Sequence, residues 1–484
     1  MLTAPLLNAC TLGPDFKSPD APAAQGYIPG QVLTAPSDVP GRWWDRFRSQ
    51  NLSKLIDDGL ERNTDLQAAE AALRVAQANT YTQRAALFPI ITAGFDGNRI
   101  RVPTEVLTTD SAAGKNIYSV NTAQVSVAFV PDVFGGIRRQ IESTEALAEV
   151  QAFQREGVFL TLSANIALAA IQEASLRGQI AVTRRLIEIQ NQSLSTLKIQ
   201  YDRGQIALPD VVAQETAVAQ ARLLLPVLEK QLGQQRNLLA YLTGRLPGEG
   251  IAETFQLGSF RLPRPVPVSL PADLIRQRPD VRAAEANLRS VNAQIGVAIA
   301  NRLPQINLTG NVGSSASTIG NLFTPQTAVW LVAGSVAQTV FDAGAKESKQ
   351  RAAEAATEQA LALYRSAVLA SFQNVADVLR ALQADERALA AASAAETSAN
   401  RSIELARAQI ERGQFTISVL LTAQQAYLQA SLARVQAQAA RLADTVALFQ
   451  ALGGGWWNRV EVIPAGPAAA TLQAKNEISR ETPQ

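Results

Sequence analysis

Residues 345–412 read AKESKQRAAEAATEQALALYRSAVLASFQNVADVLRALQADERALAAASAAETSANRSIELARAQIER, and these 68 residues contain neither glycine nor proline. The run is rich in Ala, Leu, Glu, Gln and Arg, which are strong helix formers. A mean globular helix has only about 11–12 residues, whereas a single helix of this length would measure ~100 Å at about 1.5 Å per residue. Because a compact core does not need such a rod, the run predicts an element that spans a distance.

The composition excludes most kinds of enzyme. The chain has 484 residues, 47% of them hydrophobic and 18% charged, with a net charge of +2 and no histidine. The usual general base and the commonest metal ligand are therefore missing, and the single Cys allows neither an internal disulfide nor a thiolate metal cluster. Residues 453–455 (GGG) lack the context of a nucleotide-binding loop. We expect no catalytic residue, no metal, no cofactor and no nucleic acid partner, and the absence of an 18-residue apolar run predicts no transmembrane helix.

The lone cysteine lies in a motif for lipid attachment. Cys10 follows residues 7–9 (LNA), which fit the lipobox of a bacterial lipoprotein, with Leu at −3 and a small residue at −1. Residues 1–9 would then be a residual signal, and because they contain no Lys or Arg we expect the true start to lie upstream. Residues 10–50, whose first part is rich in Pro, Ala, Gly and Asp, predict a lipidated extended segment. The alternative is an incidental cysteine.

The sequence repeats with a period of about 210 residues. Residues 65–74 (DLQAAEAALR) resemble 280–289 (DVRAAEANLR), and residues 203–205 (RGQ) match 412–414 (RGQ). Two matches in the same order favour a true repeat over chance similarity between alanine-rich helices. The predicted domains are a first repeat over 51–260, a second repeat over 261–457 and a disordered C-terminal tail over 458–484.

Each repeat is predicted to hold a helix, a β-hairpin, a long helix and a return helix. The hairpin strands show apolar and polar residues in alternation, as in 123–129 (AQVSVAF). Glycine after a helix is an expected stop, so both long helices should turn at their RGQ triplets. The first repeat has a helix over about 52–87, a hairpin over about 89–131, a long helix over about 136–203 and a return helix over about 209–243. The second repeat has a helix over about 270–302, a hairpin over about 304–340, a long helix over about 345–412 and a return helix over about 418–452.

The hairpins point to a shared β-barrel. Strands of about ten residues with one apolar and one polar face suit a transmembrane barrel, although a soluble hairpin packed on one side would alternate in the same way. Four strands cannot close a barrel alone, because open edges are not tolerated in lipid and about eight strands is the minimum. The strands must therefore be pooled between subunits. Three subunits would give twelve strands, while two or four would also close.

Several motifs occur in an order that is typical of one family. They are CTLGPDF (10–16), WWDRF (43–47), DVFGGIRR (132–139), LPADL (270–274), RPDV (278–281), VFDAG (340–344) and LFQALGGGW (448–456). The chain resembles the TolC-like outer-membrane factor family and is most similar to its OprM/NodT-type efflux lipoproteins. The resemblance implies an α+β membrane protein. Its homotrimer would hold a 12-stranded outer-membrane barrel with four strands per chain, a mixed equatorial layer and a long periplasmic helical barrel.

The resemblance also implies a function. Such proteins are passive exit ducts of tripartite efflux systems for drugs or other toxic small molecules, and they are not enzymes. The implied partners are two further copies of the chain, a periplasmic membrane-fusion adaptor, an inner-membrane pump of the RND type and outer-membrane lipid. A duct for type I protein secretion has the same fold and stays open as the alternative, whereas a non-channel scaffold would not need alternating strands. The exported substrate is not readable from the sequence.

Two sites carry over from the resemblance. The family contacts its adaptor through helix-turn tips, which here are Arg203, Gly204, Gln205, Ile206 and Ala207, and Arg412, Gly413, Gln414, Phe415 and Thr416. A plain helix stop would explain the glycines but not both RGQ triplets. The family narrows its tunnel just past the second tip, often with a carboxylate ring, and the matching positions lie near Ser418, Val419 and Thr422. None of these is acidic, and the nearest acidic residue is Asp210, so we expect an aperture closed by packing.

Overall fold

The structure is a computed structural model, and the chain divides into two compact units. The described residues are 11–20, 22, 26–28, 38–101, 117–262, 271–411 and 417–459. Residues 1–19, 73–150 and 284–364 belong to the first unit, and residues 20–72, 151–283 and 365–484 to the second. Cys10 and the second tip, Arg412 to Thr416, lie outside the described residues.

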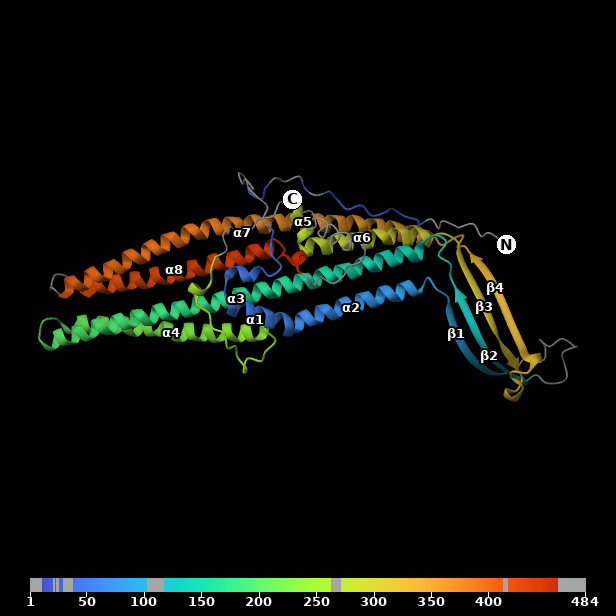
Figure 1. Ribbon diagram of the computed structural model, residues 1–484, viewed down its shortest axis with the longest axis horizontal. Coiled ribbons are helices and arrows are strands. Elements are labelled where there is room, and N and C mark those ends of the chain that lie inside the picture. Colours follow the sequence, from blue (N-terminus) through green and yellow to red (C-terminus); the bar gives the residue numbers. More distant parts are fainter. Residues whose placement is uncertain are drawn as a thin grey trace, which may run out of the picture. The chain divides into compact units, whose positions relative to one another are not determined.

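The first unit contains a four-stranded antiparallel sheet (Figure 1). Its strands are β1 (Ile90–Arg101), β2 (Ile117–Phe129), β3 (Gln305–Ala316) and β4 (Ala328–Ala337). They pair in the order β1-β2-β3-β4, so the two predicted hairpins join through β2 and β3. The outer edges of β1 and β4 pair with no described strand, which leaves the sheet open on both sides.

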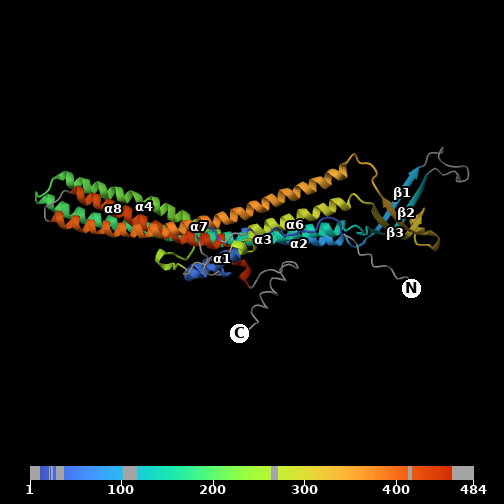
Figure 2. The same ribbon diagram turned by 90° about the horizontal axis from the view of Figure 1, so that it is seen from above.

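The two long helices are continuous. They are α3 (Gly136–Asp202) and α7 (Ala345–Glu411), each of 67 residues, and their return helices α4 (Leu208–Leu242) and α8 (Ile417–Ala451) have 35 residues each. In the second unit these four helices lie side by side (Figure 2). Gly178 does not interrupt α3, and a Cβ there would come within 3.0 Å of Val435 Cγ1 on α8, so this glycine permits close helix packing.

Both junctions from strand to long helix use an aspartate cap. The Asp132 carboxylate accepts hydrogen bonds from the backbone N–H groups of Ile137 and Arg138, at 2.9 and 3.0 Å. In the second repeat Asp342 accepts from the N–H groups of Gly344 and Lys346, at 3.0 and 2.9 Å. The N–H of Lys346 is the main reason that the pKa of Asp342 is lowered. An acidic cap satisfies the free N–H groups of a helix start and complements its dipole.

Two predicted helices are broken in the structure. The helix expected over about 52–87 consists of α1 (Gln50–Arg62) and α2 (Thr64–Ala85), and the one expected over about 270–302 consists of α5 (Pro271–Gln277) and α6 (Pro279–Ala300). The first break occurs because Asn63 caps α2, its Oδ1 accepting from the N–H of Leu66 at 3.1 Å, while its Nδ2 donates to the Leu242 carbonyl. The second occurs at Arg278, because Pro279 disfavours a helical conformation in the residue before it.

The core of the second unit contains aromatic residues from near both ends of the chain. A short 3-10 helix, Trp43–Phe47, buries Trp43, Trp44 and Phe47 at no more than 1% exposure, and Trp43 stacks on Phe449 with ring centroids 5.3 Å apart. The extended segment predicted over 10–50 is therefore not extended at its end, because residues 43–47 form a helix in the core. Asn458, the first residue of the predicted tail, donates a hydrogen bond to Asp38 at 2.8 Å, and residues 460–484 lie outside the described residues.

The glycine run 453–455 has a packing role. All three residues have positive φ, at +88°, +67° and +71°, a region that side chains other than glycine rarely adopt. A Cβ at Gly453 would lie 2.4 Å from the Gln277 carbonyl oxygen, and one at Gly455 would lie 2.4 Å from that of Pro40. The run lets the chain turn closely after α8.

Among the described residues there are also short 3-10 helices at Leu257–Ser259, Ile319–Asn321, Pro325–Thr327 and Trp456–Asn458.

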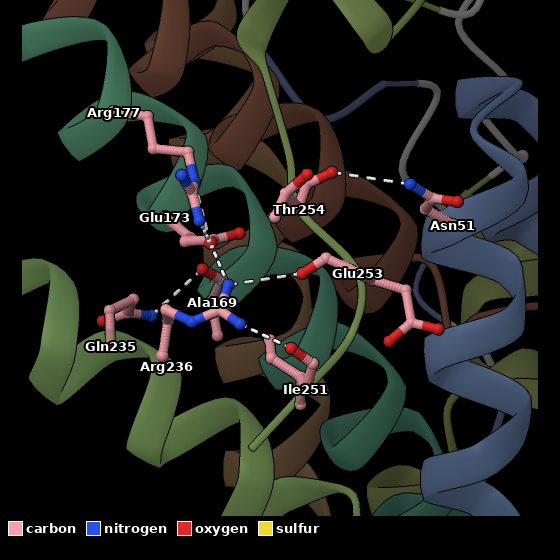
Figure 3. A network of polar contacts seen from close by, with 9 residues as sticks. All are labelled: Asn51, Ala169, Glu173, Arg177, Gln235, Arg236, Ile251, Glu253 and Thr254. Carbon is pink, nitrogen blue, oxygen red and sulfur yellow. Dashed lines mark hydrogen bonds and ion pairs between the residues drawn. The ribbon is translucent and has the colours of Figure 1, made fainter.

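A buried polar network holds the segment after α4 (Figure 3). Glu173 of α3 is fully buried, and its Oε1 accepts from Arg177 and from Arg236 of α4, both at 2.8 Å. Arg236 also donates to the carbonyl oxygens of Ile251 and Glu253. A buried carboxylate is tolerated only when it is paired in this way, so the network fixes residues 251–253 against the two helices.

Two helices are more apolar than the sequence suggested. Windows of 18 residues in α3 and α4 reach mean hydropathies of 1.3 and 1.2, enough by length and composition alone to cross a membrane. In α3, 56% of the window is buried inside the protein, as in a core helix, but in α4 only 22% is buried. The apolar surface of α4 is therefore largely uncovered within one chain.

Candidate functional site: strand faces and helical tips

The register of the sheet assigns each side chain to one of two faces. β1 pairs with β2 from Ile90↔Ala128 to Arg101↔Ile117 without interruption, and the β2–β3 and β3–β4 pairings are equally regular. Because no bulge shifts the alternation, residues two apart stay on the same face. The first face is mainly apolar, and its larger apolar side chains include Ile91, Phe95, Val125, Val127, Phe129, Ile306, Leu308, Val312, Trp330, Val332 and Val336. Arg99, Arg101, Ser119, Asn121 and Ser314 lie on the same face.

The second face is mainly polar. It carries Thr92, Asp96, Asn98, Thr122, Gln124, Ser126, Asn307, Thr309, Asn311, Ser315 and Ser335. Neighbouring strands exchange side-chain hydrogen bonds across it, with Asn311 donating to Gln124 at 3.3 Å and the Thr122 and Ser315 hydroxyls 3.2 Å apart. Apolar side chains also occur on this face, among them Ile90, Ile100, Val120, Val329 and Leu331.

The apolar face cannot remain in water. Trp330 is 77% exposed and Val332 is 78% exposed. Contiguous exposed apolar surface on this scale marks a contact with lipid or another protein. A face of apolar residues, an opposite face of polar residues and two open edges together match one segment of a lipid-embedded barrel with an aqueous lumen.

The first tip ends α3 with two backbone hydrogen bonds. The N–H of Gly204 donates to the Tyr201 carbonyl at 2.8 Å, and the N–H of Gln205 donates to the Gln200 carbonyl at 2.9 Å. This is the Schellman pattern of a helix stop, and it requires the left-handed conformation that Gly204 adopts at φ +70°. Arg203, Gly204, Gln205 and Ala207 are exposed, and a Cβ at Gly204 would meet nothing within 4 Å.

Beneath the tip, four helices share one apolar cluster. Its buried members are Leu197 of α3, Val211 of α4, Ile403 and Ala406 of α7, and Ile417, Leu420 and Ala423 of α8. Ile206 packs against this cluster and anchors the first tip to it. The end of α7 and the start of α8 belong to the same cluster, so the two helix pairs meet here.

The predicted aperture residues occupy the exposed side of α8. Ser418, Val419 and Thr422 are exposed, while Ile417 and Leu420 face the cluster. The Thr422 hydroxyl donates to the Ser418 carbonyl oxygen at 2.9 Å. Asp210 is half-buried in the first turn of α4, and no hydrogen bond or ion pair between described residues joins it to the three α8 residues.

Sequence reasoning missed two polar pairs between helices. Gln214 of α4 and Gln424 of α8 are fully buried, with Gln214 Nε2 3.5 Å from Gln424 Oε1. Asp385 of α7 and Asp444 of α8 form a carboxyl pair, and burial together with the hydrogen bond and charge of Asp385 raises the pKa of Asp444 to about 6. Neither pair has a local sequence signal, because each depends on the register between two helices.

The family model described as Outer membrane efflux protein matches residues 55–245 and 270–454. The chain belongs to the outer membrane efflux protein family. It is 29% identical over 490 residues to the probable efflux pump outer membrane protein TtgC of Pseudomonas putida, covering 100% of this chain and 98% of TtgC. It is 28% identical over 468 residues to the outer membrane protein OprJ of Pseudomonas aeruginosa, covering 94% and 95%.

Solved structures agree with this membership. The outer-membrane channel OprN superposes with a TM-score of 0.86 at 27% identity, covering 92% of this chain and 100% of OprN. The open state of the MtrE channel of Neisseria gonorrhoeae gives a TM-score of 0.82 at 26% identity, covering 93% and 100%. The predicted family, fold class, efflux function and outer-membrane location are confirmed. This outer membrane efflux protein is one third of a trimeric β-barrel that a helical barrel continues into the periplasm.

Proposed function

We propose that this efflux protein is the passive exit duct of a tripartite system that expels toxic small molecules and catalyses no reaction. The observation that carries the proposal is the four-stranded sheet, whose polar face would line an aqueous lumen and whose apolar face would meet lipid. TtgC is a probable efflux pump component, and ArpC of Pseudomonas putida, also 29% identical over 490 residues, is an antibiotic efflux pump protein. These names favour efflux over type I protein secretion.

The proposed partners are a periplasmic adaptor and, through it, an inner-membrane pump of the RND type. The first tip supports adaptor docking, because Arg203, Gly204 and Gln205 are exposed at the end of a helix that the Schellman turn and Ile206 hold in place. Residues 412–416 would form the second half of this surface. Cys10 would carry a lipid that anchors the chain in the outer membrane.

The proposed aperture lies on the exposed face of α8. Ser418, Val419 and Thr422 present two hydroxyl groups and one apolar side chain, and none carries a charge. The buried contacts between the helix pairs, including Gln214 with Gln424, would hold the duct narrow but still conducting at this level. Such a narrowing depends on packing and offers no carboxylate ring to a cation.

Two experiments test the duct. The purified trimer in a planar bilayer should conduct ions without ATP, and cells lacking their own outer-membrane channel should regain dye efflux when this chain is expressed with its adaptor and pump. A silent bilayer would contradict the channel. Export of a protein by a neighbouring ATPase, with no dye efflux, would show the type I alternative instead.

The lipid anchor has a separate test. Cys10→Ser should abolish incorporation of labelled fatty acid, while the trimer still assembles because the barrel itself holds the membrane. Label that persists in the variant would show that Cys10 is not the lipidation site.

A further inference from the structure

The apolar face of the sheet ends at a definite level. On β1 its last large apolar side chain is Phe95, and the side chains beyond it on the same face are Arg99 and Arg101. On β2 the partner of Phe95 is Ala123, and Asn121 and Ser119 follow before the strand begins at Ile117, which pairs with Arg101. Two neighbouring strands therefore change from apolar to polar at the same height, which marks one boundary of the hydrocarbon layer.

This boundary faces the outside of the cell. β1 follows α2 in the chain and runs from Ile90 to Arg101, so its last residues lie at the end away from that helix. In the outer membrane efflux protein fold the helices are on the periplasmic side. Arg99 and Arg101 consequently lie above the outer leaflet boundary and not at the inner one.

Arg99 lies near the height of a lipid head group, and Arg101 lies above it. Arg99 follows Phe95 by four residues and Arg101 by six, which is about 14 and about 20 Å along the strand, or about 10 and about 16 Å in height at a tilt of about 40°. The polar layer of a bilayer begins at the edge of the hydrocarbon and is several ångströms thick. A long arginine side chain can keep its stem against lipid and place its guanidinium in that layer.

The guanidinium groups have the chemistry for phosphate. Neither Arg99 nor Arg101 makes an ion pair with another residue that the structure describes, whereas Arg84 in the same unit pairs with Glu145. At this level the opposite face carries Ile100 and Tyr118, so the positive charge is confined to the outer face. Arginine binds phosphate oxygens through two parallel N–H groups.

We propose that Arg99 and Arg101 form a binding site on the outer surface of the barrel for the phosphate groups of outer-leaflet lipid. The ligand is an anionic lipid whose acyl chains lie against the apolar face and whose phosphate contacts the two arginines. A trimer presents three such sites.

The test uses the full-length trimer in an uncharged detergent, with fluorescent bisphosphorylated lipid A as the probe. Arg99→Gln with Arg101→Gln should weaken binding roughly fivefold for each arginine removed. Arg62→Gln with Arg74→Gln removes two exposed arginines elsewhere and should leave binding unchanged. Arg99→Lys with Arg101→Lys keeps the charge and should retain most of the affinity.

Two further arms identify the ligand. Lipid A without phosphate should bind the unmodified trimer more weakly than the bisphosphorylated form, and millimolar inorganic phosphate should not displace the lipid. Full affinity of the glutamine variant would overturn the proposal, as would displacement by inorganic phosphate, which indicates a free-anion site. The glutamine variant tests the proposal only if it forms a trimer on an unheated gel. If it does not, the proposal is overturned when the unmodified trimer binds lipid A without phosphate as tightly as the bisphosphorylated form.

Discussion

The sheet and the helical tip differ in how far their apolar side chains are buried within one chain. In the sheet, Trp330 and Val332 are more than three-quarters exposed within one chain. At the tip, Leu197, Ile403 and Leu420 are each 3% exposed and pack into one cluster. The cluster beneath the tip is therefore buried within a single chain, whereas the apolar face of the sheet depends on lipid for its burial. Substitutions in the sheet should affect assembly, and substitutions at the tip should affect docking or conductance alone.

The largest effect on trimer assembly is expected from a substitution on the apolar face of β2. Val127→Arg places a charge against lipid, which costs about 2–4 kcal/mol at the bilayer midplane, and three copies multiply the cost. Ser126→Arg is the matched control, because Ser126 precedes Val127 but lies on the polar face. An unheated gel should show loss of the trimer for the first variant only. Equal behaviour of the two would contradict the assignment of the faces.

A smaller effect is expected at the first tip. Gly204→Val forces a β-branched residue to φ +70°, a strain of about 1–3 kcal/mol that remains local because a Cβ there meets no neighbour. Gly204→Asn is the control, since Asn tolerates this conformation. Cross-linking to the adaptor should fall for valine and persist for asparagine, with the trimer intact in both. Undiminished cross-linking of the valine variant would remove this tip from the docking surface.

The carboxyl pair between α7 and α8 predicts a pH dependence. Because the pKa of Asp444 is raised from 3.8 to about 6, the folded protein holds a proton that the unfolded chain has lost in this window. Stability should therefore fall as pH rises from about 4 to about 6 and stay lower above it. Asp444→Asn should raise stability at pH 7.5 by at most about 1 kcal/mol, since the pair is half-exposed.

Thermal unfolding of the trimer at pH 5 and pH 7.5 measures this effect. Asp385→Asn should act like Asp444→Asn, and the double variant should add little, because either change removes the same repulsion. A pH slope that survives both substitutions would show that the pair does not cause it.

The smallest effect on stability, with a clear effect on conductance, is expected at the proposed aperture. Thr422→Asp on the exposed face of α8 adds one carboxylate per chain, so the trimer gains a ring that attracts cations. Thr422→Asn is the uncharged control. Millimolar divalent ions should block the aspartate variant in planar bilayers and leave the unmodified and asparagine channels open. Strong block of the unmodified channel would place an acidic ring elsewhere.

Much of the fold can be predicted from the sequence because the residues that start and stop helices are local signals. The run 345–412 predicted α7 to within one residue, since it lacks helix breakers, and Gly204 marked the end of α3. Pro279 is also a local signal, because a proline disfavours a helical conformation in the residue before it and so predicts the break at Arg278. The break at Asn63 was not readable in the same way, because its cap is completed by the carbonyl of Leu242, 179 residues away.

Less of the candidate site than of the fold can be predicted from the sequence. Alternation predicted strands, but which face meets lipid follows from pairing across the halves, such as Val125↔Val312. The buried Gln214–Gln424 pair and the Asp385–Asp444 pair depend on helix registers that no local pattern specifies. The tip residues were found through the repeated RGQ triplet, and their role in docking stays a prediction.

The most direct test of the account measures the two faces of β2 in the assembled trimer. Single cysteines at positions 124–129 are introduced into a Cys10→Ser chain, which otherwise has no cysteine. A water-soluble maleimide should label positions 124, 126 and 128, which face the lumen, and should leave 125, 127 and 129 unlabelled against lipid. Labelling with no two-residue period, or with the opposite period, would contradict the claim that this sheet is part of an aqueous barrel.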